Sequence, residues 1–171
     1  MGLSRKLKNL NLFNEGNSYQ GQAKTVTLPK LARKTEDWRA AGMNGTVKVD
    51  MGMSDDGLVL EWTLGGLDLI SIRQFGIAKI DGVYMRFAGA YQQDDTGEYA
   101  AVEVVVRGRH EEIDMGDAEV GEDTEHKIVT NCTYYKLTVN GVVEVEIDLL
   151  GMIETINGED RLAEQRNAIG L

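Results

Sequence analysis

The chain has 171 residues, a hydrophobic content of 42%, and 18 Lys and Arg side chains against 28 Asp and Glu, which gives a formal net charge of −10. This size and composition predict one globular domain with a substantial core and exclude a disordered chain. The acidic balance argues against a groove that grips nucleic acid, because phosphate contacts need Lys and Arg. The single cysteine, Cys132, cannot form an internal disulfide, and the basic opening lacks an apolar run typical of a signal peptide. We therefore expect the chain to fold in a cytoplasm.

The charge is unevenly distributed along the chain. Residues 1–50 carry nine basic and four acidic side chains, net +5, whereas residues 51–171 carry nine basic and twenty-four acidic ones, net −15. A basic segment joined to an acidic body is complementary to other copies of itself and favours head-to-tail assembly. The plainer alternative is an uneven solvated surface.

Residues 1–22 lack a core pattern, and we expect them to form an N-terminal arm. From Ala23 onward the pattern is mostly short strands. Residues 39–57 are rich in glycine and methionine, which predicts a protruding loop with an adaptable contact surface; a mobile surface loop without a partner is the alternative. The next segment, Leu58–Leu64, is predicted to be a strand with its leucines and Trp62 facing inward.

Between Gly66 and Ile80 the apolar residues fall near helical spacing, with Asp68 as a candidate N-cap, so we expect one short helix over the end of the sheet. A strand at Val83–Tyr91 should pair, across residues 94–97, with a long strand that begins at Ala100.

The dipeptide Asn140-Gly141 lies between two alternating apolar runs, Tyr134–Val139 and Val142–Asp148, and predicts a β-hairpin in which Val143, Val145 and Ile147 face inward. A second, more polar helix is expected at Glu159–Asn167. The elements predict a single domain over residues 1–171, mainly β and leaning towards α+β: an antiparallel β-sandwich or barrel with one or two short helices.

The sequence offers little catalytic chemistry. P-loop, dinucleotide-binding, zinc-protease and nucleophile-elbow motifs are all absent from it. A nucleophilic site would need Cys132 or a serine beside His110 or His126, the two histidines. Cys132 alternates with Thr130 and Tyr134, which is typical of a small packed side chain on a strand. We therefore predict no enzyme and no cofactor.

Eight carboxylates crowd residues 111–125. Clustered carboxylate oxygens suit calcium, but this run lacks the register of a calcium loop around a central glycine. A solvated or lumen-facing loop is the favoured interpretation, and we predict no metal site. A calcium-dependent β binding module remains a remote alternative.

Short motifs occur in order along almost the whole chain. They are residues 11–14 (NLFN) with Gly16, 27–31 (TLPKL), 39–45 (RAAGMNG), 87–91 (FAGAY), 94–98 (DDTGE), 107–109 (RGR), 121–125 (GEDTE), 147–148 (ID), 152–154 (MIE), 156–158 (ING) and 169–171 (IGL). In this order and spacing the chain resembles the major tail tube proteins of contractile-tailed bacteriophages, the FII family, and is also similar to R-type pyocin tube proteins.

The resemblance implies a virion protein, assembled in the cytoplasm of a host bacterium, whose hexameric rings stack into a hollow inner tube. It implies as partners further copies of the chain, a tail sheath protein, a tape-measure protein, and baseplate hub and tail terminator proteins, with DNA passing through the lumen without sequence-specific binding. Alternatives within the same class are the tube of an R-type bacteriocin and a ring protein of type VI secretion systems.

Two sets of residues are predicted to carry this function. Candidates for contacts between subunits and rings are Arg5, Lys6, Arg39, Met43, Asn44, Met51 and Met53. Candidates for acids that line the lumen are Glu103, Glu144, Glu146 and Asp148. An acidic lumen wall would repel a passing duplex instead of binding it.

Overall fold

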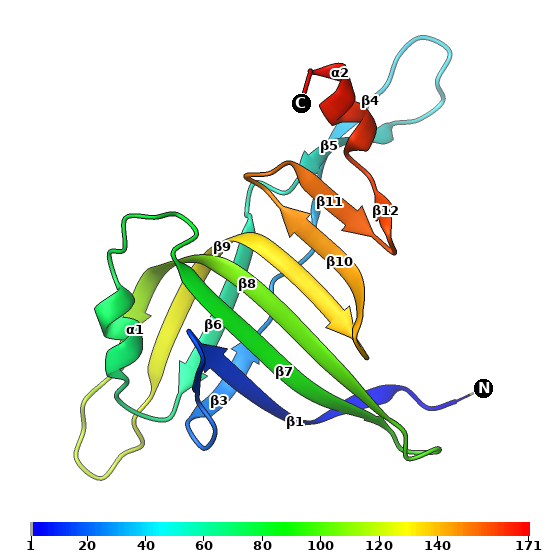
Figure 1. The fold of residues 1–171 in the computed structure, drawn as a ribbon. Coiled ribbons are helices and arrows are strands. Elements are labelled where there is room, and N and C mark those ends of the chain that lie inside the picture. The colour runs from blue at the N-terminus through cyan, green and yellow to red at the C-terminus, as the bar shows by residue number, and fades with distance from the viewer. Residues whose placement is uncertain (1) are drawn as a thin grey trace.

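The computed structural model describes residues 2–171 and contains twelve strands and two short helices (Figure 1). The strands are β1 (Arg5–Asn14), β2 (Asn17–Ser18), β3 (Ala23–Thr27), β4 (Arg33–Trp38), β5 (Val47–Met53), β6 (Leu58–Leu64), β7 (Val83–Gln93), β8 (Tyr99–Asp114), β9 (His126–Val139), β10 (Val142–Asp148), β11 (Ile153–Ile156) and β12 (Glu159–Asp160). The helices are α1 (Leu69–Gln74) and α2 (Ala163–Ala168). Neither helix is long and apolar enough to cross a membrane.

Ten strands form one antiparallel sheet in which β9 is shared between two branches. The main order is β12-β11-β10-β9-β8-β7-β1-β2, while β6 pairs with β9 and with β3. The first half of β9 pairs with β6 and its second half with β10, because β9 is twice as long as either neighbour. Side chains of β1, β7, β8 and β6 meet in a single core around Leu12, Met85, Val104 and Trp62. The predicted mainly β architecture is confirmed.

The predicted hairpins are confirmed, with one local exception. β7 pairs with β8 and β9 pairs with β10, each across the turn that the sequence predicted. Along β6 the alternating leucines and Trp62 are fully buried. On β10, Val145 and Ile147 are buried but Val143 is 40% exposed, because a β-bulge between Val143 and Val145 shifts the alternation by one residue.

Both predicted helices are present. Asp68 caps α1 by accepting hydrogen bonds from the backbone N–H groups of Ile70 and Ser71. The second helix is shorter than predicted: Glu159–Asp160 form β12, paired with β11, and helix α2 begins only at Ala163.

The N-terminal arm has more structure than its sequence pattern predicted. β1 pairs with β7 along its whole length, and Leu12 and Asn14 are fully buried. A bulge between Leu7 and Asn9 interrupts the two-residue alternation, so the regular pattern is limited to the short run Asn9–Leu12.

The segment 39–57 contains a loop over residues 39–46 and then strand β5, which pairs with β4. These two strands form a separate two-stranded sheet, here called the β4–β5 hairpin. It projects from one end of the molecule close to α2, while α1 lies at the opposite end (Figure 1).

Candidate assembly surfaces

One face of the main sheet, here called the open face, points away from the core. Its residues follow from the strand registers: Asn9, Asn11, Phe13, Tyr84, Arg86, Ala88, Ala90, Tyr99, Ala101, Glu103, Val105, Arg107, Tyr134, Lys136, Thr138, Glu146 and Asp148. Most are polar or small, which is the composition of a surface that faces water.

Cations and aromatic rings of the open face are held by neighbours on adjacent strands. Arg86 lies 3.5 Å from Glu103, and its guanidinium stands over the ring of Phe13 at 4.1 Å. Arg107 lies over the rings of Tyr84 and Tyr134 at 5.4 and 6.0 Å. These contacts fix long side chains flat along the sheet.

The same contacts extend to the next strand. The Tyr134 hydroxyl donates a hydrogen bond to Glu146 at 3.2 Å. Burial, together with the Glu146 carboxylate, raises the pKa of Tyr134 to about 12, so the phenol stays protonated and continues to donate.

The predicted lumen acids do not form an acidic stripe. Glu103 and Glu146 lie on the open face, but Arg86, Arg107 and Lys136 are interleaved with them by the strand registers. Arg86 and Lys136 come next to these acids only through pairing with the neighbouring strands, which the sequence prediction did not consider. The open face is close to charge-balanced.

Asp148, which also lies on the open face, and Glu144 have more local roles. Asp148 accepts hydrogen bonds from the backbone N–H groups of Leu150 and Gly151, at 3.1 and 3.0 Å, and so stabilises the turn after β10. Glu144 lies at the β10 bulge and is half-buried.

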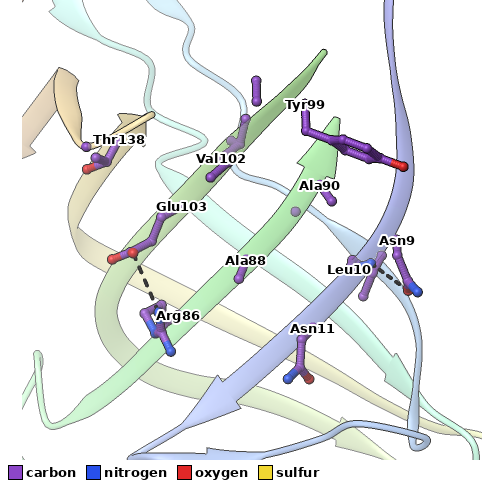
Figure 2. Close-up of a pocket in the computed structure, with 14 residues that line it drawn as sticks. Asn9, Leu10, Asn11, Arg86, Ala88, Ala90, Tyr99, Val102, Glu103 and Thr138 are labelled. Carbon is purple, nitrogen blue, oxygen red and sulfur yellow. Dashed lines mark hydrogen bonds and ion pairs between the residues drawn. The ribbon is translucent and has the colours of Figure 1, made fainter. Parts of the chain in front are cut away.

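A shallow cavity of about 590 Å³ opens on this face near the β7–β8 turn. Ala88 and Ala90 lie on its floor, the ring of Tyr99 extends above Ala90 towards β1, and the Arg86–Glu103 pair borders it (Figure 2). The small side chains create the hollow because nothing on the strand fills the space between the longer neighbours.

One face of the β4–β5 hairpin carries exposed apolar side chains together with Glu36, and the other face is charged. The register sets Trp38 opposite Val47 and Glu36 opposite Val49, so these side chains share a face. On the other face Lys48 pairs with Asp37 at 3.1 Å. The apolar side chains, here called the hairpin face, are exposed to the following extents: Trp38 58%, Val47 50%, Val49 43% and Met51 59%.

An isolated two-stranded hairpin is marginally stable in water, and an uncovered apolar face adds a solvation cost. The hairpin joins the body through a few contacts at its base. Arg33 pairs with both Asp50 and Glu154, and Met53 packs against the core. This combination is typical of a segment that is completed by a partner.

The predicted contact residues have different environments. Arg39, Asn44 and Met51 are exposed on the hairpin, and Arg5 and Lys6 are exposed on β1. Two of the predicted methionines are less accessible: the Met43 sulfur accepts a hydrogen bond from the Ala40 N–H within the loop, and Met53 is half-buried at the base. The prediction missed Trp38, Val47 and Val49, although their alternation with charged residues was a usable strand signal.

At the opposite end of the molecule, α1 turns its polar side inward. Its buried residue is Ser71, and Gln74 is half-buried. Four apolar residues of α1 and its flanking turns, here called the α1 face, are exposed: Leu67 63%, Leu69 51%, Phe75 57% and Ile80 43%. The other apolar residues of this region, Ile70, Ile72 and Ile77, are half-buried.

A chain of hydrogen bonds through the core holds this inverted helix in place. Trp62 Nε1 donates to Thr130 Oγ1 at 3.1 Å, which lies 2.9 Å from His110 Nδ1. His110 Nε2 lies 2.9 Å from Gln74 Oε1 on α1. The indole can only donate, so the Thr130 hydroxyl is free to donate to His110 Nδ1, and a neutral imidazole with its proton on Nε2 completes the chain.

The chain of hydrogen bonds continues from Gln74 to Asn14. Gln74 and Asn14 exchange two hydrogen bonds, and Asn14 also donates to the Tyr19 hydroxyl, which donates to Asp68 at 2.8 Å. Burial raises the pKa of Tyr19 and lowers that of His110 to about 4, so both groups are neutral near neutral pH.

The acidic loop lies beside α1. Residues 115–125 join β8 to β9, and His126, which follows them, lies 3.1 Å from Ser71. The carboxylates surround a cavity of about 520 Å³, and Lys24 pairs with Asp123 and Glu125 at 2.8 and 3.3 Å. Within residues 2–171, no group of three or more His, Cys, Asp or Glu side chains is placed to hold a metal ion.

Cys132 and the two histidines are all buried. The Cys132 thiol lies 3.6 Å from the Thr130 carbonyl oxygen, and burial raises its pKa to about 12, far above the range of a reactive thiolate. His110 and His126 contact Thr130, Gln74 and Ser71, so these groups serve packing in the core.

Comparisons with known proteins agree with the sequence resemblance. The family model described as phage tail tube protein FII matches residues 4–170. The chain is 55% identical to the tail tube protein of Escherichia phage P2, with both chains fully covered, and 37% identical to the major tail tube protein of Serratia phage KSP20, covering 100% of this chain and 99% of the relative. It also shares its fold with a chain of the sheath–tube complex of an extracellular contractile injection system, at a TM-score of 0.56 and 8% identity, covering 76% of this chain and 88% of that one.

Proposed function

Because this chain belongs to the phage tail tube protein FII family, we propose that it builds the hollow inner tube of a contractile phage tail by forming hexameric rings that stack. The observation that supports this most is the hairpin face, an apolar surface on a two-stranded sheet that water alone would destabilise. The proposed role is structural, without a chemical reaction.

Free strand edges provide a route to ring closure. β2 pairs only with Phe13 and Asn14, and the Leu12 carbonyl oxygen accepts a hydrogen bond from the Tyr19 N–H, so one edge of β1 from Arg5 to Asn11 has no strand partner within residues 2–171. At the other end of the sheet, β11 pairs with β10 only from Val145 onward. Such edges are liabilities in a monomer, and neighbouring subunits in a ring would cover them.

We further propose that the open face lines the lumen and that DNA passes along it without specific binding. Arg86 is already paired with Glu103, and Arg107 lies on two tyrosine rings. Cations engaged in this way have less to gain from phosphate contacts, so a passing duplex would not adhere. The sheath, tape-measure, baseplate hub and tail terminator proteins are the proposed partners, and the virion, assembled in the cytoplasm of the host bacterium, is the proposed location.

Electron microscopy of the purified protein tests tube formation. We expect long hollow tubes in negative stain from the intact chain. Deleting Met43–Met53 removes residues 43–46 of the loop and all of β5, including Met53 at the edge of the core, but leaves every fully buried core residue in place, so we expect folded subunits that do not polymerise. Dispersed monomers from the intact chain at high concentration, or normal tubes from the deletion variant, would contradict the proposal.

The lumen assignment needs a separate test. In phage particles built with this chain, Glu103→Lys with Glu146→Lys should leave tube length unchanged and slow DNA entry into the cell, because six copies per ring would add unpaired cations to the wall. Glu164→Lys, on the exposed side of α2, is the matched control. Unaltered DNA entry with the double variant would contradict the assignment of the open face to the lumen wall.

The tube of an R-type bacteriocin is a second candidate within the same class, and the fold shared with an extracellular contractile injection system favours keeping it. The two differ in cargo. Purified particles that contain DNA and transfer it to cells would support the phage tail, whereas contractile particles without a genome would support the bacteriocin.

A further inference from the structure

Asparagine followed by glycine occurs three times in this chain, at Asn44-Gly45, Asn140-Gly141 and Asn157-Gly158. This dipeptide reacts with itself without an enzyme when the backbone nitrogen of the glycine attacks the side-chain carbonyl carbon of the asparagine. Glycine favours the reaction because it has no side chain to hinder the approach. In a folded protein, the reaction depends on whether the asparagine is free to rotate into the reactive geometry.

Two of the three pairs are held in tight turns between strands. Asn140 and Asn157 have left-handed backbone conformations, with φ of 50° and 52°. The Asn140 N–H donates to the Ala101 carbonyl oxygen at 2.8 Å, and its side-chain oxygen accepts from the Ala101 N–H at 2.9 Å. The Asn157 N–H donates to the Glu144 carbonyl oxygen at 2.9 Å. Ring closure brings the Asn Cβ and the next backbone nitrogen into one plane, which the left-handed ψ does not allow, so these turns must open before they react.

Asn44-Gly45 lies in a different environment. It is part of the loop between β4 and β5, which Figure 1 shows projecting beyond the rest of the fold. Both residues are exposed and neither has a positive φ. The hydrogen bonds within the loop join Ala40 with Met43 and involve neither residue of the pair. A Cβ added to Gly45 would meet no atom within 4 Å, so the attacking nitrogen lies in open space.

We infer that Asn44 is a site of spontaneous deamidation in the folded subunit, and that the fold protects Asn140 and Asn157. The Gly45 nitrogen loses its proton and forms a bond to Asn44 Cγ. The bond from Cγ to the amide nitrogen then breaks, and that nitrogen takes up the proton and leaves as ammonia, which gives a succinimide. Water adds to one of the two ring carbonyl carbons and the adjoining ring C–N bond breaks, which leaves aspartate or isoaspartate. One water molecule is consumed and one ammonia is released.

The modification changes the charge of the loop without disturbing the fold. Arg39 is the only charged side chain of residues 39–46, which therefore carry +1, and a new carboxylate at position 44 brings this charge to 0. The Asn44 side chain is exposed and makes no contact that the fold depends on. Modified subunits should therefore stay folded and accumulate. Urea unfolding of Asn44→Asp should give the midpoint of the intact chain, and a clearly lower midpoint would contradict the isolation of this site.

Peptide mass spectrometry measures the rate at each of the three sites. The intact chain is diluted until light scattering shows dispersed subunits, and is then incubated at mildly alkaline pH. The same chain unfolded in urea is the reference, because there all three pairs are equally free and should react at similar rates. In the folded chain Asn44 should react at close to its unfolded rate. Asn140 and Asn157 should react about tenfold or more slowly than when unfolded, because their turn hydrogen bonds must break first.

Asn44→Gln is the matched control. The longer side chain would have to close a larger ring and reacts far more slowly, so ammonia release from the folded variant should fall to the slow rate of the two protected turns. A folded chain in which Asn44 reacts as slowly as Asn140, or in which Asn140 or Asn157 reacts first, would overturn the inference. The measurement is made on dispersed subunits, so its result is independent of whether the chain forms tubes.

Discussion

Acid should weaken this fold through His110, by an amount that follows from its position in the core. The imidazole is 5% exposed, accepts from the Thr130 hydroxyl and donates to Gln74 on α1. Burial lowers its pKa from 6.5 to about 4. Because the folded-state pKa lies below the unfolded one, the unfolded chain binds the extra proton first, and stability is lost as the pH falls from about 6.5 through 4.

The size of the loss can be worked out from the two pKa values. A difference of 2.5 between them corresponds to about 3 kcal/mol when fully expressed below pH 4, and to about 2 kcal/mol at pH 5. Asp68 is the charged group that acts on the imidazole, and its carboxylate favours the protonated form and so limits the shift.

The assay is urea unfolding at pH 7.5 and pH 5 for the intact chain and for His110→Gln, at one protein concentration. Glutamine offers an amide oxygen towards Thr130 and an amide nitrogen towards Gln74 but does not titrate. Subtracting the two pH effects cancels the other carboxylates and any contribution from assembly. We expect the intact chain to lose about 2 kcal/mol more than the variant. Equal losses in the two proteins would refute the reasoning.

Three further predictions concern single residues. Gly108→Ala should lower the free energy of unfolding by about 3 kcal/mol or more, or give insoluble protein, because a Cβ there would lie 1.9 Å from a backbone carbonyl oxygen of β9. Gly45→Ala, where a Cβ meets open space, is the control, and equal urea midpoints for the two variants would contradict the argument. Asp68→Ala should lower the free energy of unfolding by about 2 to 4 kcal/mol and speed amide hydrogen exchange in α1, because it removes the helix cap and the buried acceptor of a tyrosine hydroxyl. Asp68→Asn should keep most of the cap, and unchanged exchange in the alanine variant would contradict the prediction. Iodide should quench the fluorescence of Trp38 in free subunits but not in tubes, while the buried Trp62 is protected in both. Quenching of Trp38 that persists in tubes would show that the hairpin face stays uncovered.

Features set by adjacent residues could be predicted from the sequence. The Asp68 cap needs only the next three residues, and the Asn140-Gly141 turn needs only its two positive φ angles. The burial of β6 likewise follows from strict alternation. These signals are local, so no knowledge of the partner strand was required.

Features that depend on pairing could not be predicted in the same way. The bulge in β1 separates Leu7 from the alternating run Asn9–Leu12, and the bulge in β10 moves Val143 to the surface. Likewise Glu103 looks like an unpaired acid along β8, and only the register with β7 shows Arg86 beside it. A one-residue shift reverses the face of every later side chain, so charge balance across a sheet is a property of the register.

Helix α1 is the sharpest case, because its sequence spacing indicates the wrong side. Leu69 and Phe75 fall near helical spacing and would be placed against the core by hydrophobicity alone, yet both are more than half exposed. The inward positions go to Ser71 and Gln74, whose hydrogen bonds complete a buried polar chain that an apolar side chain would leave unsatisfied. Leu69 and the flanking Phe75 are therefore left exposed in the subunit, as is the hairpin face at the other end. Assembly into the proposed tube would cover exposed apolar side chains that the subunit alone leaves in water.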